Sequence, residues 1–270
     1  MGSFGIHFFA ILAILSSQCT LSAAQIFLTN LCLGGNYTAN SNFQDNLRLL
    51  LSDISNNTVH SNSLFYNDTV GRIPDSVYGL FQCRGDILPD DCKNCVKRAA
   101  ERIMDLCPYR KESIVFYQEC SLQYSNKLFV STVQFEPTYQ LNNPANFSDP
   151  DLFSPKKNEL MDRLVVQALA SPNLFASGVE NVTTSQKIYG LVQCTQDLSR
   201  NDCDRCLRRA VSGVTECCDK MLSVFTLKPS CNARYENYPF FQPTPVATAP
   251  ASPPNRNYTQ GMCTYWNVFY

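Results

Sequence analysis

The sequence predicts an α+β fold of two tandem small domains, each with two helices packed on an antiparallel β-sheet and stapled by disulfides. Three observations predict it. A cysteine pattern from the first half returns in the second half, and helical periodicity recurs at corresponding places in both halves. The later part of each half is rich in β-branched and aromatic residues, which favour strands.

The chain begins with a segment that we expect to be cleaved. A short apolar run, Phe8–Leu15, precedes the small residues Ser22–Ala24, which is the pattern of a secretory signal peptide, although no Lys or Arg precedes the run. The run is too short for a membrane anchor, because a spanning helix needs about 20 apolar residues. Cleavage after Ala24 removes Cys19, one of the 14 cysteines.

Six Asn-x-Ser/Thr sequons fit the same secretory route and predict a glycosylated, extracellular protein. They begin at Asn36, Asn56, Asn67, Asn146, Asn181 and Asn257. No apolar stretch near about 18 residues follows the signal segment, so we expect no membrane span in this chain. The net charge of -1 gives no reason to expect nucleic acid as a partner.

Five cysteines of the first half recur in the second half, each 111 residues later, which indicates a tandem duplication. The pairs are Cys83 and Cys194, Cys92 and Cys203, Cys95 and Cys206, Cys107 and Cys218, and Cys120 and Cys231. The lead-in Tyr78–Leu80 likewise returns as Tyr189–Leu191. We therefore predict a signal peptide over residues 1–24, domains over 25–133 and 134–242, and a Pro-rich disordered tail over 243–270.

Apolar periodicity places two helices in each domain. The first helix of domain one rests on Leu47, Leu50, Leu51 and Ile54, and its looser counterpart in domain two rests on Leu160, Leu164, Val165 and Ala168. The second helices carry the stripes Cys92, Cys95, Ala99 and Ile103, and Cys203, Cys206, Ala210 and Val214. Asp90 and Ser199 are the expected N-caps of these second helices.

Later segments of each domain are predicted as strands, at Ser113–Tyr117 and Val224–Leu227. Between the domains, Glu136–Pro155 is polar and rich in proline, so we expect a loop or an extended connector there.

Each domain holds the spacing Cys-x8-Cys-x2-Cys, which is compatible with a zinc site, a thioredoxin-like redox site or structural disulfides. An oxidising secretory route favours disulfides. Small domains also need such cross-links, since they bury little apolar area, and each bridge contributes about 2–4 kcal/mol.

This cysteine spacing, the lead-in Tyr78–Cys83 and the closing Arg234–Phe240 resemble the plant ginkbilobin-homologous domain, also called the salt-stress/antifungal domain. Two such domains behind a signal peptide resemble a cysteine-rich repeat secretory protein. The same pair also resembles the ectodomain of cysteine-rich receptor-like kinases. The resemblance covers nearly all of residues 25–242 and implies the same α+β unit of two helices on an antiparallel sheet.

The resemblance also implies a disulfide connectivity. The implied pairs are Cys32–Cys107, Cys83–Cys92, Cys95–Cys120, Cys194–Cys203 and Cys206–Cys231. Domain two has no counterpart of Cys32. Three cysteines are left over, of which one pair is a possible extra disulfide: Cys217, Cys218 and Cys263.

No catalytic machinery is apparent, so we predict that the chain is not an enzyme and has no metal or cofactor. One histidine, His60, remains after signal removal, and it lies in a polar stretch. The sequence has no GxSxG, HExxH or glycine-rich phosphate loop. Asp90 and Asp91 fit a helix N-terminus better than a carboxylate pair. The basic pairs Lys97–Arg98 and Arg208–Arg209 fit solvated helix faces.

Mannose binding in the resembled family depends on an Asn after the first cysteine, an Arg six residues before the last cysteine and a Glu five residues after it. Domain one has Leu33, Ile114 and Ser125 at these places, and domain two has Phe225 and keeps only Glu236. Apolar side chains cannot hydrogen-bond a sugar hydroxyl.

We therefore expect a non-enzymatic apoplastic protein with a defence, stress or signalling role, whose partner is an extracellular protein or a cell-wall or pathogen glycan. The alternatives are a mannose-binding antifungal lectin, with Glu236 as a weak carbohydrate contact, and a truncated ectodomain of a cysteine-rich receptor-like kinase.

Overall fold

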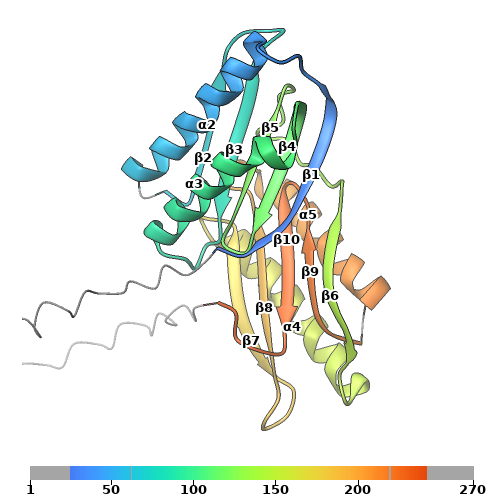
Figure 1. Cartoon of the computed structure of the whole chain (residues 1–270). Coiled ribbons are helices and arrows are strands. Elements are labelled where there is room, and N and C mark those ends of the chain that lie inside the picture. Colours follow the sequence, from blue (N-terminus) through green and yellow to red (C-terminus); the bar gives the residue numbers. More distant parts are fainter. Residues whose placement is uncertain (1–24, 62, 219, 242–270) are drawn as a thin grey trace, which may run out of the picture.

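The computed structural model describes residues 25–61, 63–218 and 220–241. They form two consecutive α+β domains, each a five-stranded antiparallel sheet with two helices against one face (Figure 1). This is the predicted fold class. Among these residues, no helix combines the length and hydropathy needed to cross a membrane. The predictions for the signal peptide, the Pro-rich tail, Cys263 and Asn257 fall outside the described residues.

Domain one begins with an edge strand and ends with the central strands of its sheet. Its elements are β1 (Phe27–Asn36), α2 (Asn42–Ser61), β2 (Phe65–Val70), β3 (Val77–Cys83), α3 (Pro89–Leu106), β4 (Arg110–Tyr117) and β5 (Cys120–Ser125). The strand order is β1-β4-β5-β3-β2.

Domain two repeats this order of elements. They are β6 (Tyr139–Asn146), α4 (Pro150–Ala170), β7 (Phe175–Asn181), β8 (Lys187–Cys194), α5 (Arg200–Cys218), β9 (Met221–Leu227) and β10 (Cys231–Glu236). The strand order, β6-β9-β10-β8-β7, matches that of domain one position by position. The duplication seen in the cysteines therefore extends to the sheet topology.

The repeated Tyr-Gly-Leu lead-in has a packing reason. Gly79 in β3 faces α2, where an added Cβ would lie 2.8 Å from Leu50, and Gly190 in β8 faces α4, where it would lie 2.8 Å from Leu164. The first helix of each domain thus approaches the sheet too closely for any larger residue. The predicted apolar stripes are buried at these helix–sheet contacts, with Leu50 and Leu164 both 0% exposed.

Ten cysteines form five disulfides in the connectivity that the family resemblance implies. Two of these bridges recur in both domains: one joins β3 or β8 to the second helix, and one joins that helix to the last strand, β5 or β10, at the centre of the sheet. Among the described residues, the bridge Cys32–Cys107 has no equivalent in domain two; it joins β1 to the end of α3. Strand register places Asn142 where domain one has Cys32, since Asn142 pairs with Val224 and Cys32 with Ser113.

Two local predictions are wrong. Asp90 is not an N-cap: α3 begins one residue earlier at Pro89, which is well suited to the first helical position, and Leu88 precedes it without a side-chain cap. The stretch Glu136–Pro155 is not simply a connector, because it contains β6 and the start of α4. Pro150 fits because it opens α4, and Pro144 fits because β6 is an edge strand, whereas Pro155 lies inside α4.

Ser199 does cap α5. Its hydroxyl accepts a hydrogen bond from the Asp202 backbone N–H at 3.1 Å and donates one to the Asp202 carboxylate at 2.8 Å. The predicted strands Ser113–Tyr117 and Val224–Leu227 lie within β4 and β9.

Candidate functional site

The two sheets meet through the faces that carry no helices. Alternate residues of β4 point away from α2 and α3, and the corresponding residues of β9 point away from α4 and α5. These outward residues form one apolar cluster across the two domains: Ile114, Phe116, Phe225 and Leu227, each at most 8% exposed, flanked by Leu28, Leu31, Leu33 and Leu141. The interface between the domains is therefore an apolar core of its own.

Two positions of the family's sugar site in domain one lie in this cluster. Leu33 and Ile114 replace the Asn and Arg that bind mannose in the resembled family, and here they pack at the interdomain interface. Ser125, at the third position, is 2% exposed, and its hydroxyl accepts a hydrogen bond from the Lys127 backbone N–H at 3.0 Å. Of the three family positions in domain one, two are therefore apolar and the third, Ser125, is buried with its hydroxyl already hydrogen-bonded.

In domain two, the Glu236 carboxylate forms an ion pair with a neighbouring arginine. This carboxylate receives two contacts of 2.8 Å from the guanidinium of Arg234, which lies on the same face because strand residues two apart do. The guanidinium lies between two aromatic rings, 5.0 Å from the centre of Phe225 and 4.1 Å from that of Phe240. Arg234 and Glu236 are 8% and 6% exposed. This geometry is that of a buried structural ion pair.

Strand register places Asn143 of domain two at the family's first sugar-site position, which the family fills with Asn. The prediction that domain two keeps only Glu236 is therefore wrong, because it keeps both Asn143 and Glu236. Asn143 pairs with Ser223 in β9, just as Leu33 pairs with Glu112 in β4. Its side-chain oxygen accepts a hydrogen bond from the Ala145 backbone N–H at 3.1 Å. Aligning the cysteines of the two domains could not reveal this position, because domain two has no counterpart of Cys32. Asn143 also follows Leu33 by 110 residues, whereas the cysteines repeat at 111 residues.

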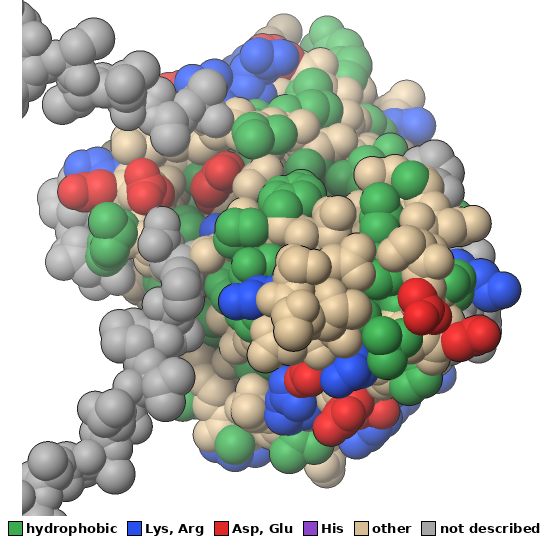
Figure 2. Space-filling model, turned by 90° about the horizontal axis from the view of Figure 1, so that it is seen from below, with side chains coloured by type: hydrophobic (Ala, Val, Ile, Leu, Met, Phe, Trp, Pro, Cys, Tyr) green, Lys and Arg blue, Asp and Glu red, His purple; other side chains and the backbone are tan. Residues whose placement is uncertain are grey.

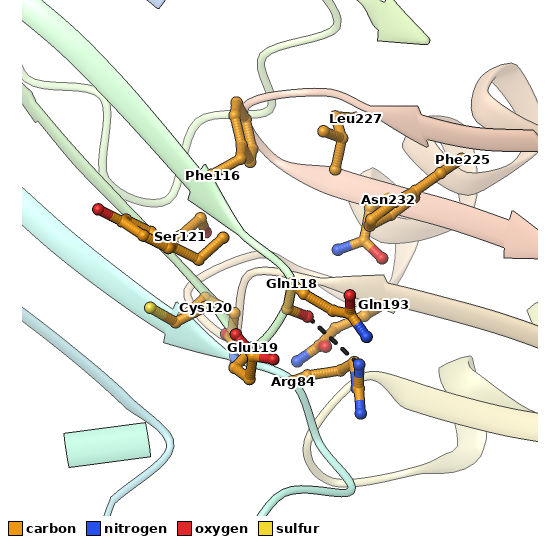
Figure 3. A pocket seen from close by; sticks show the side chains of 12 residues that line it. Arg84, Phe116, Gln118, Glu119, Cys120, Ser121, Gln193, Phe225, Leu227 and Asn232 are labelled. Carbon is orange, nitrogen blue, oxygen red and sulfur yellow. Dashed lines mark hydrogen bonds between the residues drawn. The ribbon is translucent and has the colours of Figure 1, made fainter. Parts of the chain in front are cut away.

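Two equivalent glutamines join the domains beside the apolar cluster. Gln193 in β8 donates to the carbonyl oxygen of Cys83 at 2.9 Å, and Gln82 in β3 accepts from the Gln196 backbone N–H at 3.0 Å. The cavity beside them, which Figure 3 shows between Phe116 and Leu227, has a volume of about 40 Å³. That volume holds a few water molecules and is far below the roughly 300–1,000 Å³ of small-molecule sites.

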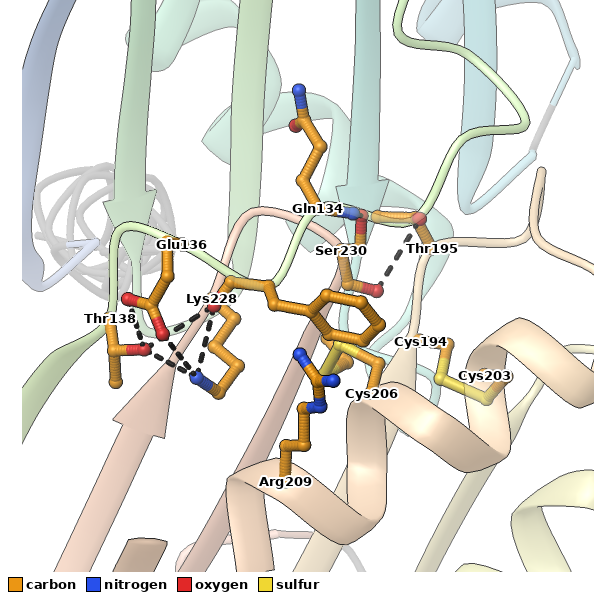
Figure 4. Close-up of a disulfide and its surroundings, with 12 residues drawn as sticks. Gln134, Glu136, Thr138, Cys194, Thr195, Cys203, Cys206, Arg209, Lys228 and Ser230 are labelled. Carbon is orange, nitrogen blue, oxygen red and sulfur yellow. Dashed lines mark hydrogen bonds and ion pairs between the residues drawn. A yellow bond between two sulfur atoms is a disulfide. The ribbon is translucent and has the colours of Figure 1, made fainter.

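The segment between β5 and β6 is fixed to domain two by hydrogen bonds. The Ser131 backbone N–H donates to Asp197 at 2.6 Å, and the Gln134 backbone N–H donates to the Ser230 hydroxyl at 2.9 Å. The side chain of Gln134 also accepts from Gln123 of domain one at 2.8 Å. Figure 4 shows Gln134 and Ser230 close together beside the Cys194–Cys203 disulfide.

An open hollow of about 590 Å³ lies at the base of α3 in domain one. Its wall carries the ion pair between Arg84 and Asp86, at 2.6 Å, with the Asp86 side chain fully buried. Glu119 also lines it, and Figure 3 shows Glu119 close to Arg84. One carboxylate oxygen of Glu119 is buried and has no hydrogen-bond partner among the described residues. Burial raises the pKa of Glu119 above its ordinary value, although the charge of Arg84 opposes this shift.

The lining of the hollow is mostly charged or polar, with two apolar residues, Ile87 and Leu88. Leu88 is 69% exposed, and Ile26, whose carbonyl oxygen accepts from Gln118 at 2.9 Å beside Glu119, is 53% exposed. Exposed leucine and isoleucine around a buried carboxylate are a combination that a protein partner can contact with both apolar and basic groups.

Residues considered for catalysis are not brought together. Asp90 and Asp91 are exposed in the first turn of α3, and Lys97 and Arg98 lie on its exposed side. The side chain of His60 lies outside those described. Within the described ranges, no group of three or more His, Cys, Asp or Glu side chains is arranged to hold a metal ion.

The face of the molecule in Figure 2 shows acidic and basic side chains intermingled, with hydrophobic ones scattered among them. The predicted glycosylation sites in the described part are exposed: Asn36, Asn56, Asn67, Asn146 and Asn181. For Cys217 and Cys218, at the end of α5, the side chains are outside those described, so their pairing stays a prediction.

Comparison with known proteins decides the family. The sequence pattern of the salt stress response/antifungal family matches residues 31–127 and again residues 140–238. The chain belongs to this family. The resemblance found in the cysteine spacing is thereby confirmed, and each of the two matches lies within one of the two structural domains.

Three kinds of curated relative are among the matches. The chain is 36% identical over 245 residues to cysteine-rich repeat secretory protein 38 of Arabidopsis thaliana, covering 87% of this chain and 96% of the relative. It is 38% identical over 204 residues to an antimicrobial ginkbilobin-2-like protein of Castanea crenata, covering 76% and 84%. It is 36% identical over 256 residues to cysteine-rich receptor-like protein kinase 25 of Arabidopsis thaliana, covering 93% of this chain but 37% of the kinase.

The chain thus spans about a third of the length of the receptor-like kinases that it matches. Among solved structures, it shares the fold of the tandem DUF26 ectodomain of the Arabidopsis thaliana cysteine-rich receptor-like protein PDLP8. The TM-score is 0.69 at 24% identity, covering 78% of this chain and 98% of that one. This likeness confirms the predicted fold of two small domains in tandem.

Proposed function

We propose that this chain is a secreted, non-enzymatic, apoplastic protein that acts in defence, stress or signalling by binding another extracellular protein. Membership of a family with secretory and antimicrobial relatives supports the extracellular setting. The predicted signal peptide and exposed sequons agree with it.

The hollow at the base of α3 carries the proposal. Its lining combines exposed Leu88 with the Glu119 carboxylate, which has a buried oxygen without a hydrogen-bond partner among the described residues. Exposed Ile26 lies outside the lining, and its carbonyl oxygen accepts from the neighbouring Gln118 backbone N–H. An unsatisfied buried acceptor is costly, and a partner's Lys, Arg or backbone N–H would satisfy it. Exposed Leu88 and Ile26 would supply apolar contact area to such an interface.

The structure supports mannose binding less well than it supports protein binding. The apolar replacements Leu33, Ile114 and Phe225 lie in the interdomain cluster, and the carboxylate of Glu236 is bound by Arg234. A sugar at this face would have to break both arrangements.

A pull-down from extracellular fluid tests the proposal, with a glycan array run beside it. The mature protein should capture a partner that Leu88→Asp does not capture, because a charge at this position opposes apolar contact. Leu128→Asp is the matched control, since Leu128 is 66% exposed but lies after β5, outside the residues that line the hollow. Equal capture by Leu88→Asp, or binding to glycans with no protein captured, would contradict the proposal.

A second candidate is that the chain corresponds to the ectodomain of a longer receptor. The match to receptor-like kinase 25 over 93% of this chain favours it. Transcript sequencing past the codon for Tyr270 tests it. An in-frame membrane span there supports the receptor, and a stop codon supports the secreted form.

A further inference from the structure

A second pocket, separate from the hollow and from the interdomain cavity, lies in domain two. It has a volume of about 320 Å³ and is bounded by α5, β6, β9 and the segment that enters β6. Its lining is polar and includes Glu136, Thr138, Gln140, Arg209, Ser212 and Lys228. The volume falls within the range of roughly 300–1,000 Å³ that is typical of small-molecule sites.

Arg209 presents unoccupied hydrogen-bond donors to this pocket. Its guanidinium lies 3.8 Å from the centre of the Phe135 ring, which holds it in a fixed orientation. Its neighbours on α5 are paired, Arg205 with Asp202 at 3.0 Å and Arg208 with Asp204 at 2.8 Å.

Across the parts of the chain that the structure describes, the Arg209 guanidinium has no hydrogen-bond or ion-pair partner. A stacked guanidinium with free donors suits a carboxylate, which it can bind through two parallel hydrogen bonds. Figure 4 shows the Arg209 side chain rising from α5, with Lys228, Glu136 and Thr138 to one side of it.

At the opposite side of the pocket, the positive charge of Lys228 and the negative charge of Glu136 neutralise each other. The Lys228 ammonium donates to the Phe135 carbonyl oxygen at 3.0 Å and to the Thr138 hydroxyl, and it lies 3.5 Å from the Glu136 carboxylate. A hydrogen bond from Thr138 and the charge of Lys228 hold the pKa of Glu136 below its ordinary value. Glu136 is therefore an ionised acceptor, with a side chain 73% exposed. The charge of Arg209 remains unbalanced.

We propose that this pocket binds a hexuronate, a sugar ring that carries a carboxylate, either free or as a unit of an acidic oligosaccharide. Arg209 holds the carboxylate. Glu136, Gln140 and Ser212 contact the ring hydroxyls. This site goes beyond the proposed function, since it takes a small ligand at a surface of domain two, whereas the hollow for a protein partner belongs to domain one.

Domain one supplies an internal comparison. The residues 111 positions earlier are Arg98 and Tyr117, in place of Arg209 and Lys228. Arg98 already donates to the Gln25 side chain at 3.3 Å, and Tyr117 brings no positive charge. The duplicated helix therefore carries an exposed arginine at the equivalent position without the rest of the site, and Arg98→Ala is a matched control.

Calorimetric titration in low-salt buffer tests the proposal on the mature protein. The probes are galacturonate, its trimer, galactose and inorganic phosphate. Galacturonate and its trimer should bind and galactose should not. Arg209→Ala should weaken galacturonate binding about ten- to hundredfold, the loss expected for a charged hydrogen-bonded pair. Arg98→Ala should leave the affinity unchanged. Arg209→Lys should also weaken binding, because an ammonium cannot make the two parallel hydrogen bonds.

Three results would overturn the site. They are galactose binding as tight as galacturonate binding, wild-type affinity in Arg209→Ala, and a loss of affinity in Arg98→Ala as large as that in Arg209→Ala. Phosphate binding as tight as galacturonate, with the same dependence on Arg209, would show a plain anion site and overturn the assignment to a sugar. Arg209 is exposed on its helix, so thermal unfolding midpoints of the variants should match the wild type.

Discussion

Gln82 and Gln193 donate to the same oxygen, the backbone carbonyl of Cys83, at 2.8 and 2.9 Å. They occupy equivalent positions of β3 and β8, so the duplication has brought two copies of one side chain to a single acceptor. Only Gln82 has a further role across the interface, since it also accepts from the Gln196 backbone N–H at 3.0 Å.

This asymmetry predicts unequal effects of two equivalent substitutions. Gln193→Ala should lower the free energy of unfolding by about 1 kcal/mol, because Gln82 still satisfies the Cys83 carbonyl. Gln82→Ala should lower it by about 1–3 kcal/mol, because it leaves the Gln196 N–H without this partner. Urea denaturation measures both. A larger loss for Gln193→Ala, or no loss for Gln82→Ala, would show that this contact does not hold the domains together.

A second prediction concerns the buried pair of domain two. Glu236→Ala should lower the free energy of unfolding by about 3–5 kcal/mol, because it leaves the Arg234 guanidinium buried without its counter-charge. Asp45→Ala is the control: it removes a pair with Arg48 in which both side chains are more than half exposed, and should cost below about 1 kcal/mol.

The same Glu236 variant separates structure from sugar binding. Calorimetry should show no sub-millimolar binding of free mannose to the wild-type protein, because the polar groups of domain two already have internal partners. Sub-millimolar binding that Glu236→Ala abolishes while the protein stays folded would mean that the lectin function persists with a rebuilt site.

Much of the fold was predictable because its cause is local. The spacing of Cys83, Cys92 and Cys95 and its repeat set the duplication, and helical periodicity located α2 and α3. Strand β6 was missed because its asparagines and Pro144 have low strand propensity, and pairing with β9 overrides that preference.

The candidate site was less predictable, for a physical reason. The sequence indicated that the side chains of Leu33, Ile114 and Phe225 cannot hydrogen-bond a sugar. It did not indicate that these three residues lie together, because the tertiary structure determines which faces of the two sheets pack against each other. The pairing of Arg234 with Glu236 did leave a signal, since residues two apart in a strand share a face.

A third prediction tests how much the burial of the ionised Glu119 carboxylate lowers the stability of the fold. Burial raises its folded-state pKa above the ordinary value of about 4.3, so the ionised form destabilises the fold. This destabilisation is absent when the pH is below the pKa of Glu119 in the unfolded chain. It is fully present when the pH is above the pKa of Glu119 in the folded protein. Glu119→Gln should therefore raise the thermal unfolding midpoint at pH 7 and lose this advantage as the pH falls to about 4.

Glu101→Gln, on the exposed side of α3, is the control and should change little at either pH. A Glu119→Gln variant that is less stable than wild type at pH 7 would show that this carboxylate stabilises the fold. It would then not be an unsatisfied group that awaits a binding partner.

The fourth prediction concerns the sheet edges. Each domain has two edge strands, β1 and β2 in one and β6 and β7 in the other. All four carry an exposed sequon asparagine: Asn36, Asn67, Asn146 and Asn181. Unpaired strand edges invite pairing with another chain, and bulky polar groups prevent it. We expect N-glycans at these positions to keep the protein from associating edge to edge.

Replacing all four asparagines with glutamine should therefore increase self-association in light scattering of the secreted protein, while its circular dichroism stays unchanged. Asn56→Gln is the matched control, because Asn56 is an exposed sequon residue on α2, away from any strand. If the control associates as strongly as the quadruple variant, the glycans act through general solubility, and their position on the edge strands has no special effect. If mass spectrometry finds the four asparagines unmodified, edge protection must come from the protein alone.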